Sequence, residues 1–188
     1  MAPSKKNGSR STTYVFIDES GFSEGSVIRR TWAPRGQTPV VRSKLRSWKR
    51  ASAIGALAYQ PSGQAKVLLR IHDGEIRAPQ VLAFLRHLLR HIPGRVAVLW
   101  DGLQAHRSKL VVEWSKRQRR LTLIRLPAYA PELNPVEGLW SWIKSTCLAN
   151  VAEDTLAPVK RRVRNGARRV RRRPAVLWGF LDKAELSL

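Results

Sequence analysis

The chain has 188 residues, a length that fits one domain, and 43% of them are hydrophobic, which is enough for a substantial core. Lysine and arginine total 35 against 13 aspartates and glutamates, so the formal net charge of +22 argues against an enzyme for neutral small molecules and favours a polyanionic partner. No apolar run reaches the roughly 18 residues that span a bilayer, no signal peptide opens the chain, and the single Cys147 excludes an internal disulfide and a cysteine zinc cluster, as expected for a reducing cytoplasm.

The first part of the chain predicts a tail and a set of strands. Residues 1–12 are polar and basic with almost nothing apolar, which is typical of a disordered arm. Four segments have the composition of strands: Tyr14–Asp18, Thr31–Pro39 with a turn at its end, Ala51–Tyr59 and Ala65–Ile71. The last two are joined by Gln60–Gln64, which suits a hairpin connection.

Helices and strands alternate in the rest of the chain. Apolar residues at helical spacing predict a helix that starts near Ala78, with Pro79 in its first turn, and stops at Pro93-Gly94. The further elements are buried strands at Arg95–Trp100 and Leu121–Arg125, and helices at Ser108–Arg117 (Leu110, Val111 and Trp114 inward), Pro135–Leu148 and Asp154–Arg172. This order predicts an α/β fold with a mixed sheet and helices on its faces.

Three acids stand at the ends or beginnings of these elements. Asp18 ends the first strand, Asp101 follows a buried strand, and Glu137 lies in the first turn of a helix. Each also has a purely structural interpretation. Asp101-Gly102 suits a turn, and Glu137 at N3, with Asn134 as N-cap, can complete a capping box.

Taken together the acids suggest a metal site. The 35 residues between Asp101 and Glu137 hold one helix, one strand and a loop, the length needed to return the next helix beside the strand that precedes Asp101. Three carboxylates on neighbouring elements suit Mg²⁺ or Mn²⁺. Two such ions about 3.5–4 Å apart can activate an attacking oxygen and stabilise a leaving one.

Four motifs carry a resemblance to a known family. They are Leu126-Pro-Ala-Tyr-Ala-Pro-Glu-Leu-Asn-Pro-Val-Glu-Gly-Leu-Trp140 followed by Ile143-Lys144, Leu99-Trp-Asp-Gly-Leu-Gln-Ala-His106, Phe16-Ile-Asp-Glu-Ser20 and Trp32-Ala-Pro-Arg-Gly-Gln-Thr-Pro39. With these motifs the chain resembles the DDE-type transposases of bacterial insertion sequences in the insertion sequence 630 branch, which are related to mariner transposases.

The resemblance implies a ribonuclease H-like fold with a five-stranded mixed sheet flanked by helices. It implies Asp18, Asp101 and Glu137 as catalytic residues that hold two Mg²⁺ or Mn²⁺ ions. The implied reaction cuts double-stranded DNA at element ends and transfers the 3′ hydroxyl into target DNA, commonly at TA, in a bacterial, nucleoid-associated setting. A nuclease of the same fold without strand transfer, and a non-catalytic DNA-binding remnant, are the alternatives.

The chain departs from the family in two ways. The family often has Asn after the second acid, where this chain has Gly102. Its members usually carry an N-terminal helix-turn-helix region that reads the element ends, whereas here the first strand is expected near residue 13. A separately encoded catalytic half, a fragment and a remnant are all open interpretations. The expected division is an arm at 1–12, the catalytic domain at 13–150 and a basic helical extension of that domain at 151–188. The expected partners are an end-reading domain or partner chain and a second copy of the chain in a homodimer.

Other residues have two interpretations each. His106 either orients a water or a phosphate beside the acids or caps a helix, and Asn134 is placed with it as a supporting or phosphate-contacting residue. The tryptophans suit core packing better than base stacking. The basic run near the C-terminus forms either a solvated helix face or a set of phosphate contacts, with Val163, Ala167 and Val170 on its apolar side. Its predicted DNA-binding residues are Lys160, Arg161, Arg162, Arg164, Arg168, Arg169, Arg171, Arg172 and Arg173.

Overall fold

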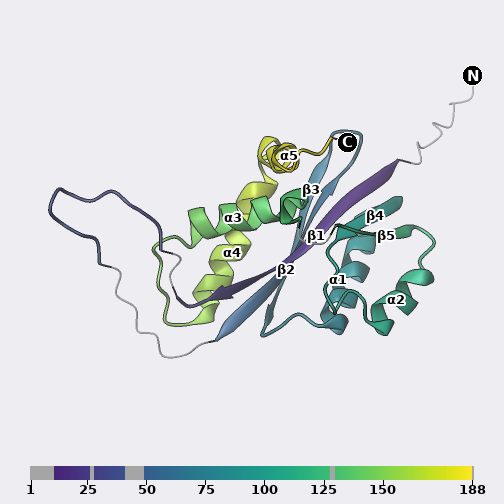
Figure 1. Cartoon of the computed structure of the whole chain (residues 1–188), viewed down its shortest axis with the longest axis horizontal. Coiled ribbons are helices and arrows are strands. Elements are labelled where there is room, and N and C mark those ends of the chain that lie inside the picture. Colours follow the sequence, from purple (N-terminus) through teal and green to yellow (C-terminus); the bar gives the residue numbers. More distant parts are fainter. Residues whose placement is uncertain (1–10, 26–27, 41–48, 128–129, 188) are drawn as a thin grey trace, which may run out of the picture.

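A mixed sheet forms the centre of the molecule (Figure 1). The computed structural model describes residues 11–25, 28–40, 49–127 and 130–187, and within these ranges the sheet has five strands in the order β3-β2-β1-β4-β5. The strands are β1 (Thr12–Ser23), β2 (Arg50–Tyr59), β3 (Ala65–Asp73), β4 (Arg95–Trp100) and β5 (Leu121–Arg125). β1, β2 and β3 pair antiparallel, while β4 runs parallel to both β1 and β5. The predicted mixed five-stranded sheet is confirmed.

Helices cover both faces of this sheet. α1 (Ala78–His91) and α2 (Lys109–Lys116) lie on one face, and α3 (Pro135–Cys147), α4 (Leu156–Arg171) and α5 (Pro174–Lys183) lie on the other (Figure 1). Each face has its own apolar core, one built around Val81, Phe84 and Leu88 and the other around Leu139 and Trp140. None of the described helices is long and apolar enough to cross a bilayer.

Strand β1 supplies side chains to both cores. Its side chains alternate between the two faces, because Val15 and Ile17 join the core under α1 while Phe16 joins the core under α3. The prediction that Asp18 ends the strand is wrong. β2 continues to pair with β1 up to Ser23, whereas the parallel partner β4 pairs only as far as Phe16. Asp18 therefore lies just past the end of the β4 ladder, although its own strand continues.

Several other expectations need correction. Residues 31–39 form no strand, because they pair with no other described segment; only the turn is present, closed by a hydrogen bond of 3.0 Å from Gln37 N–H to Pro34 O. β5 is an edge strand and only half-buried, with Ile124 exposed. Leu110 on α2 also faces solvent rather than the core. Finally, residues 1–10 of the predicted arm lie outside the described residues. Thr12, which the prediction also assigned to the arm, belongs to β1.

The C-terminal end contains a helix that the sequence analysis did not predict. Pro174, which lies just beyond the predicted helix Asp154–Arg172, is the first residue of α5, where its fixed φ and missing N–H are tolerated. Leu177 and Leu181 of α5 are buried in the core under α3, and the Tyr59 hydroxyl donates a 2.8 Å hydrogen bond to the Leu177 carbonyl. The extension after residue 150 is thus packed onto the sheet.

Candidate active site

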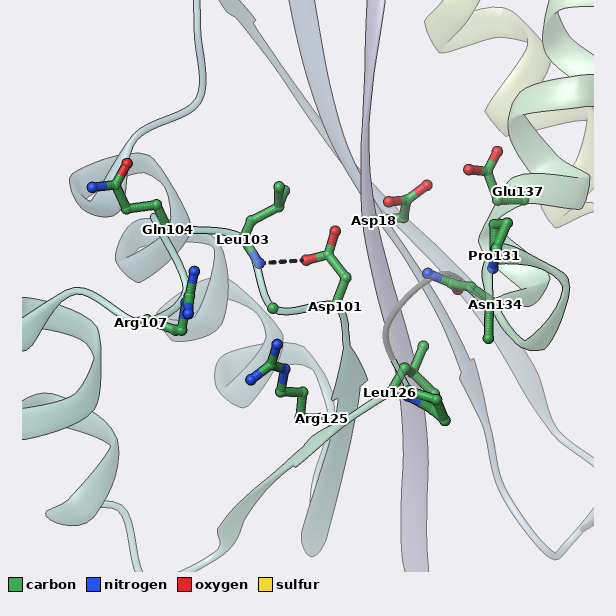
Figure 2. A pocket seen from close by; sticks show the side chains of 13 residues that line it. Asp18, Asp101, Leu103, Gln104, Arg107, Arg125, Leu126, Pro131, Asn134 and Glu137 are labelled. Atoms are coloured by element: carbon green, nitrogen blue, oxygen red, sulfur yellow. Dashed lines mark hydrogen bonds between the residues drawn. The ribbon is translucent and has the colours of Figure 1, made fainter.

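A cavity of about 520 Å³ opens where β1, the ends of β4 and β5, and the start of α3 come together. The side chains of Asp18, Asp101 and Glu137 all line it (Figure 2). The short 3₁₀ turn Pro131–Leu133 and Asn134 form its wall on the α3 side. Residues that lie far apart in the sequence thus face one open space.

Asp18 is partly buried between β1 and α3. The indole Nε1 of Trp140 donates a hydrogen bond of 2.9 Å to Asp18 Oδ2. Burial, followed by the negative charges of Glu137 and Glu19, raises the pKa of Asp18 to about 7 from an ordinary value of 3.8. The surroundings therefore oppose the ionised carboxylate, and a cation is the partner that would stabilise it.

Asp101 is held by the turn that follows β4. The Leu103 N–H donates to Asp101 Oδ1 at 3.1 Å, and His106 Nδ1 lies 2.9 Å from the same oxygen. Partial burial works against ionisation, but the hydrogen bonds from His106 and Leu103 and the positive charges of His106 and Arg125 prevail and lower the pKa of Asp101. Because Oδ1 receives both hydrogen bonds, the carboxylate is fixed in one orientation.

Glu137 lies in the first turn of α3 and its side chain is exposed. The predicted N-cap is confirmed, since Asn134 Oδ1 accepts from Val136 N–H at 3.2 Å. The capping-box interpretation of Glu137 is wrong: the Asn134 N–H that it would bind donates to the Pro131 carbonyl instead. Asn134 Nδ2 also donates to the Ile17 carbonyl at 3.1 Å, which fixes the start of α3 against β1 beside Asp18.

His106 is buried and bridges two acids. Its ring stacks on Trp100 with centroids 4.2 Å apart, and its Nε2 lies 2.9 Å from Glu19 Oε1. Burial opposes its charge, but hydrogen bonds to Asp101 and Glu19 outweigh this and raise the pKa of His106 to about 9. The cap interpretation is wrong, because Ser108 is the N-cap of α2.

Glu19, Asp101 and His106 also form a tight group in which one ligand atom from each lies within 4.8 Å of the others. Both ring nitrogens of His106 already face a carboxylate at 2.9 Å, the distance of a hydrogen bond with its proton in between. Neither Glu19 nor His106 lines the cavity. We therefore interpret this group as the support of Asp101 and the cavity acids as the set that can meet an ion and a substrate.

Sequence analysis missed three polar residues of the cavity, namely Gln104, Arg107 and Arg125. Figure 2 shows Arg107 and Arg125 on the side of Asp101 that faces away from Asp18 and Glu137. The sequence predicted Leu121–Arg125 as a strand, which marks Arg125 as its last residue but not as a neighbour of Asp101. In the parallel ladder it pairs with Trp100, the residue before Asp101.

The basic helix α4 has the predicted apolar side, since Val163, Ala167 and Val170 are buried in the core under α3. Its cations fall into two groups. Some have partners within the molecule: Lys160 pairs with Asp73, Arg162 with Glu153 at 2.8 Å, Arg171 with the Val67 carbonyl at 2.9 Å, and Arg169 lies over Trp142. Arg161 and Arg164 of α4, together with Arg172 at its C-cap, are exposed and have no side-chain partner within the described ranges.

Comparison with known families and structures identifies the chain. Residues 13–169 match the family described as DDE superfamily endonuclease. The chain belongs to this family. A comparison with curated proteins gave no match. The Mos1 mariner paired-end complex with Mg is similar to this DDE endonuclease chain with a TM-score of 0.64 and 17% sequence identity, covering 92% of this chain and 53% of that one.

Two further solved structures share the fold of the DDE endonuclease chain. The Mos1 strand transfer complex has a TM-score of 0.56 at 17% identity, covering 93% of this chain and 55% of that one. The Mos1 paired-end complex with Mn has a TM-score of 0.54 at 20% identity, covering 91% and 55%. The chain thus spans 53–55% of the length of these relatives. Its fold is the ribonuclease H-like fold of the Mos1 catalytic domain.

Proposed function

We propose that this chain is the catalytic domain of a DNA transposase of the insertion sequence 630 branch. It cuts phosphodiester bonds at element ends and joins the freed 3′ hydroxyl to target DNA, with TA as the proposed target sequence. The observation that carries the proposal is that Asp18, Asp101 and Glu137 line one open cavity.

 The family match to the DDE superfamily endonucleases supports the chemistry, and the fold shared with the Mos1 complexes supports its use in transposition.

The three carboxylates fit divalent metal ions. Carboxylate oxygens are the donors that Mg²⁺ and Mn²⁺ prefer. A bound cation would offset the burial and the neighbouring negative charges that raise the pKa of Asp18. Asp18, Asp101 and Glu137 would hold two such ions, which when bound supply activation of the attacking oxygen and neutralisation of the leaving one. The Mos1 complexes with Mg and with Mn are consistent with this choice.

The surrounding residues would keep the acids in place during the reaction. Trp140 orients Asp18 through its indole N–H, and His106 with the Leu103 N–H orients Asp101. Asn134 fixes the turn that presents Glu137. Because the supporting groups are buried or form part of the backbone, the carboxylates of Asp18 and Asp101 have few alternative orientations, which favours a preorganised site.

The proposed partner is double-stranded DNA, both as element ends and as target. The net charge of +22 supplies the sequence-independent part of the affinity. In this proposal residues 13–150 form the catalytic domain and residues 151–188 extend it with the basic helix α4. Recognition of element ends would come from a helix-turn-helix domain or a partner chain, and a homodimer would bring two ends together, as the paired-end Mos1 complexes do for that protein.

The experiment that tests the function uses a labelled duplex with a free 3′ hydroxyl, a supercoiled plasmid and Mg²⁺, with EDTA as the control. Labelled DNA joined to the plasmid, with junctions at TA, is the expected result. Plasmid nicking without joined product would instead indicate a nuclease without strand transfer. Binding without cutting or joining, in Mg²⁺ and in Mn²⁺, would indicate a non-catalytic DNA-binding protein.

The unpaired cations of α4 should carry more of the DNA affinity than the paired ones. We expect the triple variant Arg161→Gln, Arg164→Gln, Arg172→Gln to bind nonspecific DNA more weakly. Its slope of log K against log salt should be smaller by about 2–3, because each lost phosphate contact removes about 0.9. Fluorescence anisotropy titrations at several salt concentrations measure both quantities.

A matched control removes the same number of charges from the same helix. The variant Lys160→Gln, Arg162→Gln, Arg171→Gln replaces cations that already bind Asp73, Glu153 and the Val67 carbonyl. Its salt slope should fall by less than about 1, since these cations are already engaged within the protein. An equal fall in both variants would contradict the assignment of the free cations as the phosphate contacts.

A further inference from the structure

Gly102, directly after Asp101, leaves room for the side chain of Arg125. A Cβ atom built on Gly102 would lie 2.5 Å from Nη2, 2.6 Å from Nε and 2.7 Å from Cζ of Arg125. These distances are too short for any non-glycine residue unless the guanidinium moves away. Gly102 is not among the glycines with positive φ, so space rather than backbone conformation explains the glycine.

The fold brings Arg125 to this place by the pairing of β4 with β5. Arg125 is the register partner of Trp100, and the next residue, Leu126, donates its N–H to the Trp100 carbonyl at 2.8 Å. The guanidinium therefore projects from a fixed backbone position over the turn that carries Asp101. It lines the cavity together with Arg107, which comes from the same turn (Figure 2).

The guanidinium of Arg125 has no ion pair or side-chain hydrogen bond with any residue that the structure describes. It lies near enough to Asp101 to lower the pKa of that acid, but the two groups form no salt bridge. Its planar set of N–H donors faces an open cavity, and such a fork matches the oxygens of a phosphate. A phosphodiester of DNA is the anion that the proposed function supplies there.

We propose that Arg125, assisted by Arg107, binds a phosphate of the DNA strand beside the one that reacts, and that Gly102 keeps the space that its guanidinium needs. This inference rests on the proposed function for the identity of the ligand. In the cavity the acids, with their metal ions, would meet the reacting phosphate, while the two arginines on the far side of Asp101 would hold its neighbour. Arg125 is thus a positioning residue for the substrate strand.

The test compares DNA binding in EDTA for the wild type, Arg125→Ala, Gly102→Ala and the double variant. Arg125→Ala should reduce the slope of log K against log salt by about 0.9, the value for one phosphate contact. Gly102→Ala should reduce the slope by a similar amount, because the added methyl group displaces the guanidinium. The double variant should lose no more than Arg125→Ala alone, since both changes remove one contact.

A matched control is Arg95→Ala, which removes an exposed arginine from the opposite end of β4. Its slope should stay within about 0.3 of the wild-type slope, because this position makes no phosphate contact in the proposal.

Cleavage gives a second measurement. With Mg²⁺ and saturating DNA, Arg125→Ala and Gly102→Ala should both cut about 10–100-fold more slowly, the cost of a misplaced strand.

The outcomes separate this inference from the proposed function. A reduced slope for Arg125→Ala and Gly102→Ala, in a protein that cuts no DNA, would support the phosphate contact while the transposase function fails. An unchanged slope for Arg125→Ala would overturn the phosphate contact even if the wild type cuts DNA. A wild-type slope for Gly102→Ala, or an additive loss in the double variant, would overturn the role of Gly102.

Discussion

Replacing Asp101 by Asn is expected to remove Mg²⁺-dependent DNA cleavage and to leave DNA binding nearly intact. Asn keeps the shape of the side chain and an oxygen that accepts from Leu103 N–H, but it loses the charge that a metal ion needs. Metal-ion stabilisation of the transition state amounts to several kcal/mol. At about 1.4 kcal/mol per tenfold, the expected loss in rate is about 10³-fold or more. The binding constant should change less than about threefold, because no phosphate contact is removed.

The measurements for this prediction are single-turnover cleavage with protein in excess and anisotropy titrations with the same duplex. Asp182→Asn is a matched control, because it makes the same substitution at an exposed acid of α5, away from the cavity. It should cut DNA as the wild type does. Substantial cleavage by the Asp101→Asn protein would refute the assignment of Asp101 as a metal ligand.

Among the substitutions proposed here, replacing Trp140 by Ala is expected to cause the largest loss of stability. It is 1% exposed, its ring edge lies against Gly55, where a Cβ would be 2.6 Å from Cη2, and Phe22 meets it edge-on at 6.0 Å. Trp140→Ala should lower the free energy of unfolding by about 3–5 kcal/mol, the usual cost of a deleted core aromatic. Urea denaturation followed by circular dichroism measures this change. Trp142→Ala, at a half-buried position on the same helix, should cost clearly less.

Trp140→Phe separates the packing role from the hydrogen bond to Asp18. Phe keeps most of the buried ring but has no N–H, so the variant should stay folded and lose only about 1–2 kcal/mol of stability. Its cleavage rate should still fall about tenfold, because Asp18 is no longer oriented by a donor. A Trp140→Phe protein that cuts DNA at the wild-type rate would show that Trp140 acts only through packing.

Helix α1 and strand β4, which belong to the part of the fold with parallel strands, were predicted well from the sequence. The helical spacing of Val81, Leu85 and Leu88 and the apolar run that forms β4 are local signals that tertiary packing did not override. The failures involve contacts across the fold. Residues 31–39 have the composition of a strand but pair with no segment that the structure describes, and Pro174 starts α5 because Leu177 and Leu181 are buried in the core under α3.

The candidate site was predictable in part for the same reason. Asp101 and Glu137 adjoin a strand and a helix whose limits follow from local patterns. The Trp140–Asp18 hydrogen bond, the bridge made by His106 and the position of Arg125 depend on residues that meet only in three dimensions. Only the parallel pairing of β4 with β5 pointed to Arg125, and it requires the ladder register, which the sequence does not reveal on its own.

The alternation of side chains along strand β1 limits which insertions and deletions this chain can accept during evolution. Asp18 and Glu19 are neighbours, yet one faces the cavity and Trp140 while the other faces His106 on the opposite side of the sheet. Deleting or inserting one residue in β1 before Asp18 would turn Asp18 to the side of His106 and Glu19 to the side of the cavity. A shift of two residues would keep each acid on its own side but displace Asp18 by about 6.6 Å along the strand. Any change in the length of β1 before Asp18 would therefore remove the acid from its place.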